Sequence, residues 1–271
     1  MRVNENTAVS TSKILLVPYD AHHVERYHEW MQNESLREAT ASDLLSLDEE
    51  YENQQSWRTA HDKLTFIVCQ RQNVCPKNAD IDDVIRAGED DAPPSCMVGD
   101  VNLFLTPLDD DDEDGDGDGD RNGCMNGGTK AEKGETRYVK GEIDIMIAAP
   151  EHRQKGLGEA VVRAFLRYLT ENHGDVMREY VRAAAAGIES AAKIKRLVAK
   201  IHAENAGSIR LFGNLGFRRD GDPDYFNEIS MMLDFPPSSP TAEIGDEGTE
   251  SGGLGYRECF YDRSRLGGEM R

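Results

Sequence analysis

Residues 142–162 read EIDIMIAAPEHRQKGLGEAVV, and this stretch decides the expected fold. Its first six residues place isoleucine at every second position, which predicts a strand, Glu142–Ile147, with its two acids on the opposite face. A loop with two glycines follows, and apolar residues then recur at every fourth position from Leu157 to Leu169. That period is typical of an amphipathic helix, here beginning near Gly156. The stretch therefore predicts a strand, a glycine-containing turn and a helix in immediate succession.

The turn in this unit, RQKGLG at 153–158, has the features of an anion site. Backbone N–H groups at a helix start lack partners, and the helix dipole adds partial positive charge there. Arg153 and Lys155 add charge, and glycine lets the backbone approach a diphosphate closely. The spacing matches neither G-x-x-x-x-G-K-[ST] nor G-x-G-x-x-G. A tight turn without a ligand is the alternative, but the preceding strand and following helix favour an anion site.

A second block, AENAGSIRLFGNLGF at 203–217, follows another predicted strand, Arg196–His202. In this order, the two blocks resemble the cofactor motifs of the GCN5-related N-acetyltransferases, whose first motif is [RQ]-x-x-G-x-[GA]. Other segments resemble the N-acetyltransferase 9-like proteins of that superfamily, namely 16–19, 23–24, 27–31, 40–42, 65–68 and 97–105. The resemblance extends over residues 1–70, 95–106, 141–170 and 196–235.

The resemblance implies an α/β (α+β) fold, in which a mixed, strongly twisted sheet is flanked by helices and splays apart between its fourth and fifth strands. It implies acetyl-CoA as cosubstrate, lying in the splay with its pantetheine arm added to the edge of the strand Glu142–Ile147. The cofactor contacts that it implies are Met146, Ile147, Ala148, Arg153, Gln154, Lys155, Gly156, Leu157, Gly158, Asn205 and Ser208.

Acetyl transfer to an amine needs a group that removes the ammonium proton, and a positioned carboxylate can do so directly or through water. Glu142 stands at the distance before the loop where the histone-acetyltransferase branch has its glutamate base, and Asp144 shares its face. Exposed acids on the polar face of a strand are the alternative for both. Many family members carry a tyrosine as general acid where this chain has Phe212, so Tyr225 or a water molecule would have to replace it.

The expected activity is N-acetylation of a protein amine, either an N-terminus or a lysine, by direct attack on the thioester. The resemblance to N-acetyltransferase 9-like proteins points to tubulin or microtubules as a partner. Two alternatives stay open. One is an acetyltransferase-like binding module with weak or no catalysis, which the Phe212 substitution favours. The other is a regulatory acetyl-CoA sensor that binds the cofactor without turnover.

The charge balance of the chain limits its partners. It has 51 acids against 31 Lys and Arg in 271 residues, a net charge of −20, and nine of the acids lie in 109–120. The remainder is still acidic, which disfavours nucleic acid as a partner and favours a basic acceptor. No apolar run approaches the roughly 18 residues of a membrane span, and the first ten residues have no apolar leader. These features predict no membrane partner.

Cysteine and histidine usage predicts no metal centre. The five cysteines follow no C-x-x-C spacing, which indicates reduced thiols and a cytoplasmic location. His22, His23 and His28 lack a second ligand cluster in the sequence and are expected on a helix surface. The acidic run begins like an EF-hand loop, but Arg121 replaces the bidentate glutamate. A solvated charge run is the better interpretation of that segment.

The chain is expected to form one acetyltransferase domain over residues 1–235. Three segments interrupt it, a polar loop at 71–95, an acidic low-complexity insertion at 107–138 and an exposed helical insertion at 174–195. Residues 236–271 are rich in Pro, Ser and Gly and predict a disordered tail. Further elements are expected at 13–19, 64–70, 97–105 and 226–233 as strands, and after Ser46 and at 208–215 as helices.

Overall fold

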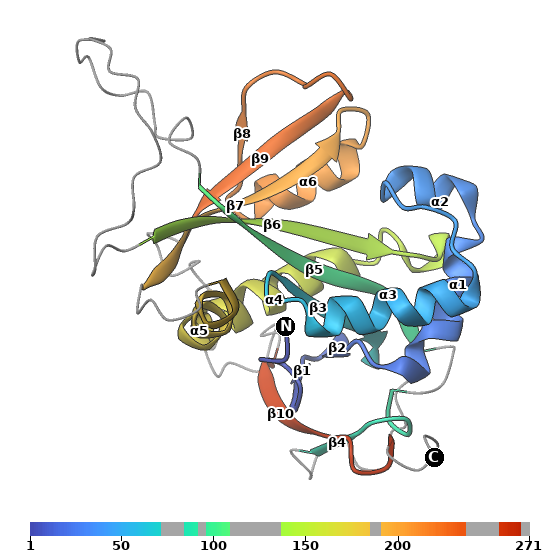
Figure 1. Cartoon of the computed structure of the whole chain (residues 1–271). Helices are drawn as coiled ribbons and strands as arrows, with labels where there is room; N and C mark the ends of the chain where they lie inside the picture. Colours follow the sequence, from blue (N-terminus) through green and yellow to red (C-terminus); the bar gives the residue numbers. More distant parts are fainter. Residues whose placement is uncertain (72–83, 92–95, 109–136, 185–190, 237–254, 267–271) are drawn as a thin grey trace.

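The computed structural model describes residues 1–71, 84–91, 96–108, 137–184, 191–236 and 255–266 (Figure 1). Its strands are β1 (Thr7–Ser10), β2 (Ile14–Pro18), β3 (Lys63–Gln70), β4 (Val84–Arg86), β5 (Met97–Pro107), β6 (Arg137–Ile147), β7 (Ala192–His202), β8 (Arg218–Asp220), β9 (Glu228–Asp234) and β10 (Arg257–Asp262). Its helices are η1 (Ala21–His23), α1 (Val24–Met31), α2 (Glu34–Ala39), α3 (Leu47–Thr59), η4 (Pro150–His152), α4 (Leu157–Glu171), α5 (His173–Ala184) and α6 (Ala206–Asn214). None of these helices is long and apolar enough to cross a membrane.

All ten strands join one mixed sheet in the order β4-β10-β1-β2-β3-β5-β6-β7-β9-β8. The neighbouring strands β2, β3, β5 and β6 pair antiparallel in that order, whereas β6 and β7 are parallel. The chain crosses from β6 to β7 through α4 and α5, as a parallel connection requires. The predicted fold class, a mixed sheet flanked by helices, is confirmed.

Helices cover both faces of the sheet, because its central strands carry apolar residues on both sides. Leu16 packs in the core under α4, while its neighbours Leu15 and Val17 pack in the second core beside α1. The helix stripe predicted from Leu157 to Leu169 is buried against the first core. Figure 1 shows α1 and α3 in front of the sheet and α4 behind it. The second core and these front helices define the face on which the candidate site lies.

The end of β6 lies in close backbone contact with β5. Gly99 of β5 pairs with Ile147, and a Cβ placed on Gly99 would lie only 1.8 Å from the carbonyl oxygen of Met146. No side chain fits there without moving the backbone of β6. Gly99 is therefore needed to hold Met146 and Ile147 against β5.

Several local predictions are confirmed. Ser46 caps α3, since its Oγ accepts from the backbone N–H of Glu49 and the Glu49 side chain accepts from the backbone N–H of Ser46. The strands at 13–19, 64–70, 97–105, 196–202 and 226–233 all appear, with shifted ends. The acidic run at 109–120 lies outside the described residues.

Other expectations need correction. The helical insertion ends at Ala184, and residues 192–195 belong to β7. Its helix, α5, is not simply exposed, because Val176 and Met177 are buried in the core. Within the predicted loop at 71–95, residues 84–86 form β4, and within the predicted tail, residues 257–262 form β10.

The strand β10 is held by contacts that are remote in sequence. Cys259 and Tyr261 alternate inward and are buried, and β10 pairs with β1 on one side and with β4 on the other. Just beyond the strand, the guanidinium of Arg263 donates to both carboxylate oxygens of Asp20, at 3.0 and 2.7 Å, and to Glu5. These partners lie more than 240 residues away, so no local signal predicts the strand.

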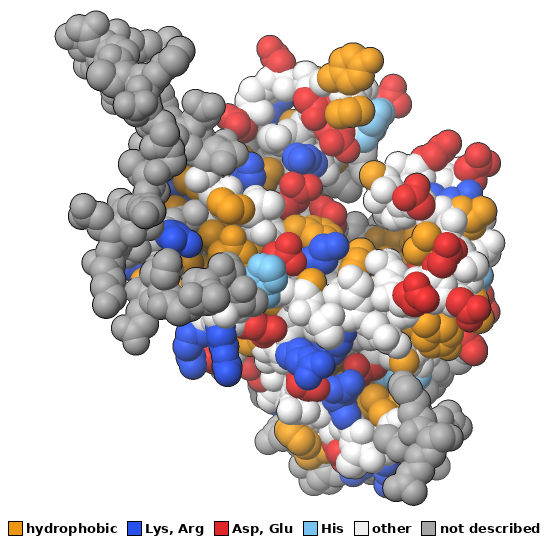
Figure 2. All heavy atoms as spheres, viewed as in Figure 1, with side chains coloured by type: hydrophobic (Ala, Val, Ile, Leu, Met, Phe, Trp, Pro, Cys, Tyr) orange, Lys and Arg blue, Asp and Glu red, His pale blue; other side chains and the backbone are white. Residues whose placement is uncertain are grey.

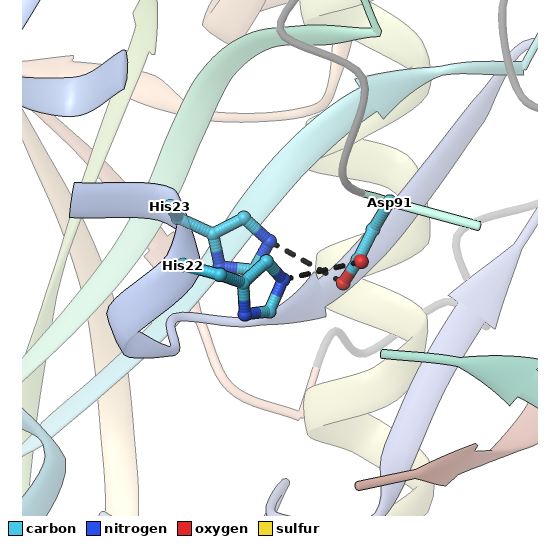
Figure 3. A group of neighbouring side chains, drawn as sticks. All are labelled: His22, His23 and Asp91. Atoms are coloured by element: carbon cyan, nitrogen blue, oxygen red, sulfur yellow. Dashed lines mark hydrogen bonds and ion pairs between the residues drawn. The ribbon is translucent and has the colours of Figure 1, made fainter. Parts of the chain in front are cut away.

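A buried carboxylate, Asp91, joins this strand to the start of α1 (Figure 3). Its Oδ1 lies 3.1 Å from His22 Nε2 and accepts from the N–H of Gly88, while its Oδ2 lies 3.3 Å from His23 Nε2 and accepts from the hydroxyl of Tyr261. Burial acts to raise the pKa of Asp91, but the contacts with both histidines outweigh it and hold that pKa well below its usual range. The expectation that these histidines lie on a helix surface is wrong for His23, which is fully buried, whereas His22 and His28 are partly exposed.

The protonation of His23 favours hydrogen bonding over metal binding in this cluster. The backbone N–H of Asp20 donates to His23 Nδ1 at 3.1 Å, so that nitrogen carries the lone pair. Burial lowers the pKa of His23, which keeps the ring neutral, and the proton then sits on Nε2, facing Asp91. The nitrogen that would have to bind a metal ion therefore has no lone pair to offer.

Replacing Gly99 with alanine tests the close contact between β5 and β6. The added Cβ displaces the Met146 carbonyl, and we expect a loss of about 1–3 kcal/mol or more in the free energy of unfolding, measured by urea titration. Gly213→Ala is the matched control, because a Cβ there meets nothing within 4 Å in a helix. It should stabilise the protein by about 0.5–1 kcal/mol. Equal effects of the two substitutions would contradict the contact.

Replacing Tyr261 with phenylalanine tests the attachment of β10. The fully buried hydroxyl donates to Asp91, so its removal leaves one carboxylate oxygen with a missing donor and should cost about 1–3 kcal/mol of unfolding free energy. Tyr225→Phe removes a hydroxyl from a side chain that is 96 % exposed and should change stability by less than about 0.5 kcal/mol. Calorimetric unfolding of both variants gives the comparison, and an unchanged Tyr261→Phe melting curve would refute the attachment.

Candidate functional site

The site begins where the two parallel strands separate. Pairing between β6 and β7 runs from Arg137 opposite Ala192 to Glu142 opposite Val198. Beyond these residues β6 continues against β5 alone, and β7 against β9 alone. Among the described strands, the β7-facing edge of residues 143–147 thus has no partner. This is the splay that the sequence resemblance implied, and an unpaired strand edge can accept an extended ligand by backbone hydrogen bonding.

The predicted glycine-containing turn closes one end of this splay. Gln154 has φ +59° and Gly156 has φ +73°, so the chain makes a left-handed turn immediately before α4. Gly156 is the N-cap of α4 and offers no capping side chain, which leaves the first N–H groups of the helix available to an anion. A Cβ on Gly158 would lie 2.9 Å from Leu211 of α6, so this glycine lets the two helices approach each other.

Three cations near the turn have different roles. Arg153 turns back onto the strand end, where its Nε donates to the carbonyl of Ile147 at 2.9 Å and its Nη2 to the carbonyl of Ala148 at 3.0 Å. It thereby fixes the turn, a role that the sequence did not predict. Lys155 is exposed in the turn. Lys13, which precedes β2, brings its Nζ to 3.4 Å from the Cβ position of Gly156 and adds a positive charge that the sequence did not indicate.

The second predicted motif forms the start of α6, beside the end of β7. Asn205 is the N-cap, and its Oδ1 accepts from the backbone N–H of Ser208 at 3.1 Å. Phe212 is buried and packs edge-on against Phe217, so it belongs to the core and has no proton to donate. Tyr225, considered as its replacement, is 96 % exposed and packs edge-on against Phe226 between β8 and β9.

The two predicted catalytic acids project from β6 on the face that carries α1 and α3. Glu142 forms an ion pair with Lys200 of β7, with 3.4 Å between Oε2 and Nζ. Asp144 is an exposed residue, but atoms of the neighbouring strands crowd around its carboxylate and partly desolvate it. This desolvation, together with the charges of Glu142, Asp100 and Glu228, raises the pKa of Asp144 to about 7, and Lys200 opposes the shift. A carboxyl group with that pKa can act as a base near neutral pH.

A polar pair on β5, which the sequence analysis did not single out, adjoins Asp144. Asn102 lies directly opposite Asp144 in the β5–β6 pairing, and Asp100 is the next residue along on the same face. Asp100 accepts from the hydroxyl of Tyr27 at 3.2 Å and from Asn102 Nδ2 at 3.0 Å, while burial raises its pKa to about 6. The sequence signal that could have indicated this pair is the placement of two polar residues at alternate positions of the otherwise apolar segment 97–105.

Figure 2 shows this face hollowed between the part formed by α6, β8 and β9 and the part formed by α2, with acidic side chains gathered beside the hollow. The arrangement joins three features: a strand edge without a partner, a helix start able to hold an anion, and a carboxyl group poised to accept a proton. Such a site can bind an extended, phosphate-containing cofactor and deprotonate a second substrate.

Comparisons with known proteins agree with this geometry. Residues 13–218 match the family described as "Acetyltransferase (GNAT) domain". The chain is 38 % identical over 233 residues to an N-acetyltransferase 9-like protein of Schizosaccharomyces pombe, covering 86 % of this chain and 98 % of that one. It is 35 % identical to the human alpha/beta-tubulin-N-acetyltransferase 9, covering 86 % of each. In fold it resembles a Vibrio cholerae spermidine N-acetyltransferase solved with CoA and spermine, with TM-score 0.50, 14 % identity and coverage of 82 % and 96 %.

Proposed function

Because the chain belongs to the GNAT family of N-acetyltransferases, we propose that it transfers the acetyl group of acetyl-CoA to an amine of tubulin, with Asp144 as the general base. The observation that carries the catalytic part is the raised pKa of Asp144 at the splay of β6 and β7. The acceptor follows from relatives in mouse, human and Drosophila that are named alpha/beta-tubulin-N-acetyltransferase 9. Cys69, Cys96 and Cys259 are buried and form no disulfide among the described residues, which fits a cytoplasmic location for this reaction.

The residues around the splay fit acetyl-CoA. The unpaired edge at residues 143–147 offers backbone groups to the two amides of a pantetheine arm. The uncapped start of α4, with Gly156 and Lys155, suits a pyrophosphate, and Lys13 adds charge beside it. Bound there, the cofactor supplies an activated thioester. Asn205 and Ser208 begin α6 on the other wall, and we propose that they complete the cofactor site.

In the proposed mechanism, Asp144 accepts a proton from the ammonium group of the acceptor, and the amine nitrogen so freed attacks the thioester carbon. A C–N bond forms, the C–S bond breaks, and the nitrogen passes its second proton to water. Because Phe212 replaces the usual tyrosine, no protein acid at that position protonates the departing sulfur. Thiols have an ordinary pKa near 8.5, so the sulfur can leave as a thiolate. Lys200 holds Glu142 in an ion pair beside the base.

Thermal unfolding with acetyl-CoA tests the cofactor site. Acetyl-CoA at 100 times its dissociation constant adds about 2.7 kcal/mol to the free energy of unfolding. This should raise the melting temperature by on the order of 5–10 °C. Gly156→Glu should abolish the shift, since a side chain is strained at φ +73° and a carboxylate repels phosphate. Gly213→Ala, far from the turn in sequence and free of close contacts, should keep it. No shift in the parent protein at millimolar acetyl-CoA would favour a binding module instead of an enzyme.

The pH dependence of kcat/KM tests the base. Ionised Asp144 is the active form, so the rate should rise with pH through about 7 and level off above it. Asp144→Asn should lower the plateau about 100-fold or more and remove this rise. Glu142→Gln removes a negative neighbour and should move the rise to lower pH, whereas Lys200→Met should move it to higher pH. A rise that persists in Asp144→Asn but vanishes in Glu142→Gln would make Glu142 the base.

A further inference from the structure

Two buried oxygen atoms on β5 lack hydrogen-bond donors within the part of the chain that the structure describes. They are Oδ1 of Asp100 and Oδ1 of Asn102, in side chains whose residues are 2 % and 6 % exposed. The other atoms of the pair are in use, because Asp100 Oδ2 accepts from both Tyr27 and Asn102 Nδ2. A buried acceptor without a donor is costly, so a native site that keeps two side by side needs a reason.

The strand pairing places both residues next to the proposed base. Residues directly opposite in an antiparallel pair project from the same face with their Cβ atoms roughly 4.5–5.5 Å apart. Asn102 stands in this relation to Asp144, and Asp100, two residues along β5, shares the face. The two acceptors therefore lie beside the carboxyl group that is to receive a proton. They do not belong to the cofactor wall, which is formed by the edge of β6 and the starts of α4 and α6.

The surroundings of these oxygens are rich in negative charge, and the buried hydroxyl of Thr65, opposite Asn102 on β3, makes no hydrogen bond to them. The charged groups that face Asp144 are Glu142 on its own strand, Asp100 on β5, Lys200 on β7 and Glu228 on β9. Lys200 is engaged by Glu142 at 3.4 Å. A ligand that satisfies these oxygens must bring both N–H donors and positive charge. A primary ammonium group has three N–H donors and a full charge in one small tetrahedral unit.

We propose that Asp100 and Asn102 form a subsite for the ammonium group of the acetyl acceptor, binding two of its N–H groups while the third points to Asp144. This inference deepens the proposed function and rests on it. The subsite selects the protonated amine and delivers it to the base, so recognition and deprotonation take place at one point. The charge of Asp100 also contributes to the raised pKa of Asp144, which ties amine binding to the strength of the base.

A simple cation tests the subsite without any turnover. The probe is n-butylammonium at pH 7, with n-butanol as the uncharged molecule of similar size, each titrated into the isotopically labelled protein. Backbone amide shifts of β5 and β6 report binding. The parent protein should bind the ammonium with a millimolar dissociation constant and should not bind the alcohol. Lack of ammonium binding by the parent, or equal binding of the two probes, would overturn the proposal.

Variants identify the residues. Asp100→Asn keeps an acceptor for Tyr27 but removes the charge, and should weaken ammonium binding about 10-fold or more. Asn102→Ala is the second variant, expected to act in the same direction and available if Asp100→Asn does not fold. Glu171→Gln, which removes an equal charge from a surface pair with Arg167 on α4, should leave binding unchanged. An effect of Glu171→Gln equal to that of Asp100→Asn would show that only the overall charge matters.

The same variants separate this inference from the proposed function. With tubulin peptides as acceptors, Asp100→Asn should raise the KM for the peptide while leaving the affinity for CoA unchanged. If the protein binds n-butylammonium through Asp100 but acetylates no tubulin peptide, the subsite is supported and tubulin is ruled out as the acceptor. If the parent protein acetylates the peptides and Asp100→Asn has the same KM for them, the proposed function is supported and the subsite is refuted.

Discussion

The end of the parallel pairing between β6 and β7, at Glu142 and Val198, is the constraint on which the rest of the structure depends. A parallel ladder satisfies the backbone groups of both strands, so its interruption leaves one strand edge open. Three features maintain the interruption. Gly99 lets β6 lie close against β5, Arg153 ties down the carbonyl groups at the end of β6, and β7 turns away with β9. The opening is thus built into the backbone.

The opening also organises the chemistry by charge. On the side of the α4 turn, backbone N–H groups with Lys155 and Lys13 provide the positive environment that phosphates need. On the face of α1 and α3, Asp100, Glu142 and Asp144 provide a negative one. One end of the site thereby suits an anionic cofactor and the other a cationic acceptor. In a chain with net charge −20, this separation fits the separate locations that we propose for the two substrates.

Sequence patterns predicted the elements that local chemistry determines. The stripe from Leu157 to Leu169, the capping box at Ser46 and the turn at Gly156 each depend on residues within one or two helical turns, and each appears in the structure. The family was recognisable from two motifs. The sequence offered Glu142 and Asp144 as candidate bases but gave no reason to prefer Asp144, because the pKa of Asp144 depends on desolvation by the folded chain and on the charges of Asp100, Lys200 and Glu228 from three other strands.

What the sequence could not provide depends on contacts between distant residues. The strand β10 exists because Asp91 accepts from Tyr261 and because Asp20 accepts from Arg263, over separations of 170 and 243 residues. His22 and His23 look like surface residues until Asp91 is placed beside them. Likewise, Asp100 and Asn102 read as ordinary strand residues until the pairing of β5 with β6 sets them next to Asp144.

Hydrogen exchange of the β6 amides, with and without acetyl-CoA, tests the splay most directly. Amides of residues 138–142 lie within the ladder with β7 and should exchange slowly in both states. Among residues 143–147, the amides that face the opening should exchange quickly in the free protein and become protected when the cofactor adds to the edge. Slow exchange across all of β6 in the free protein, or protection by acetyl-CoA confined to other strands, would contradict an open edge that binds the cofactor.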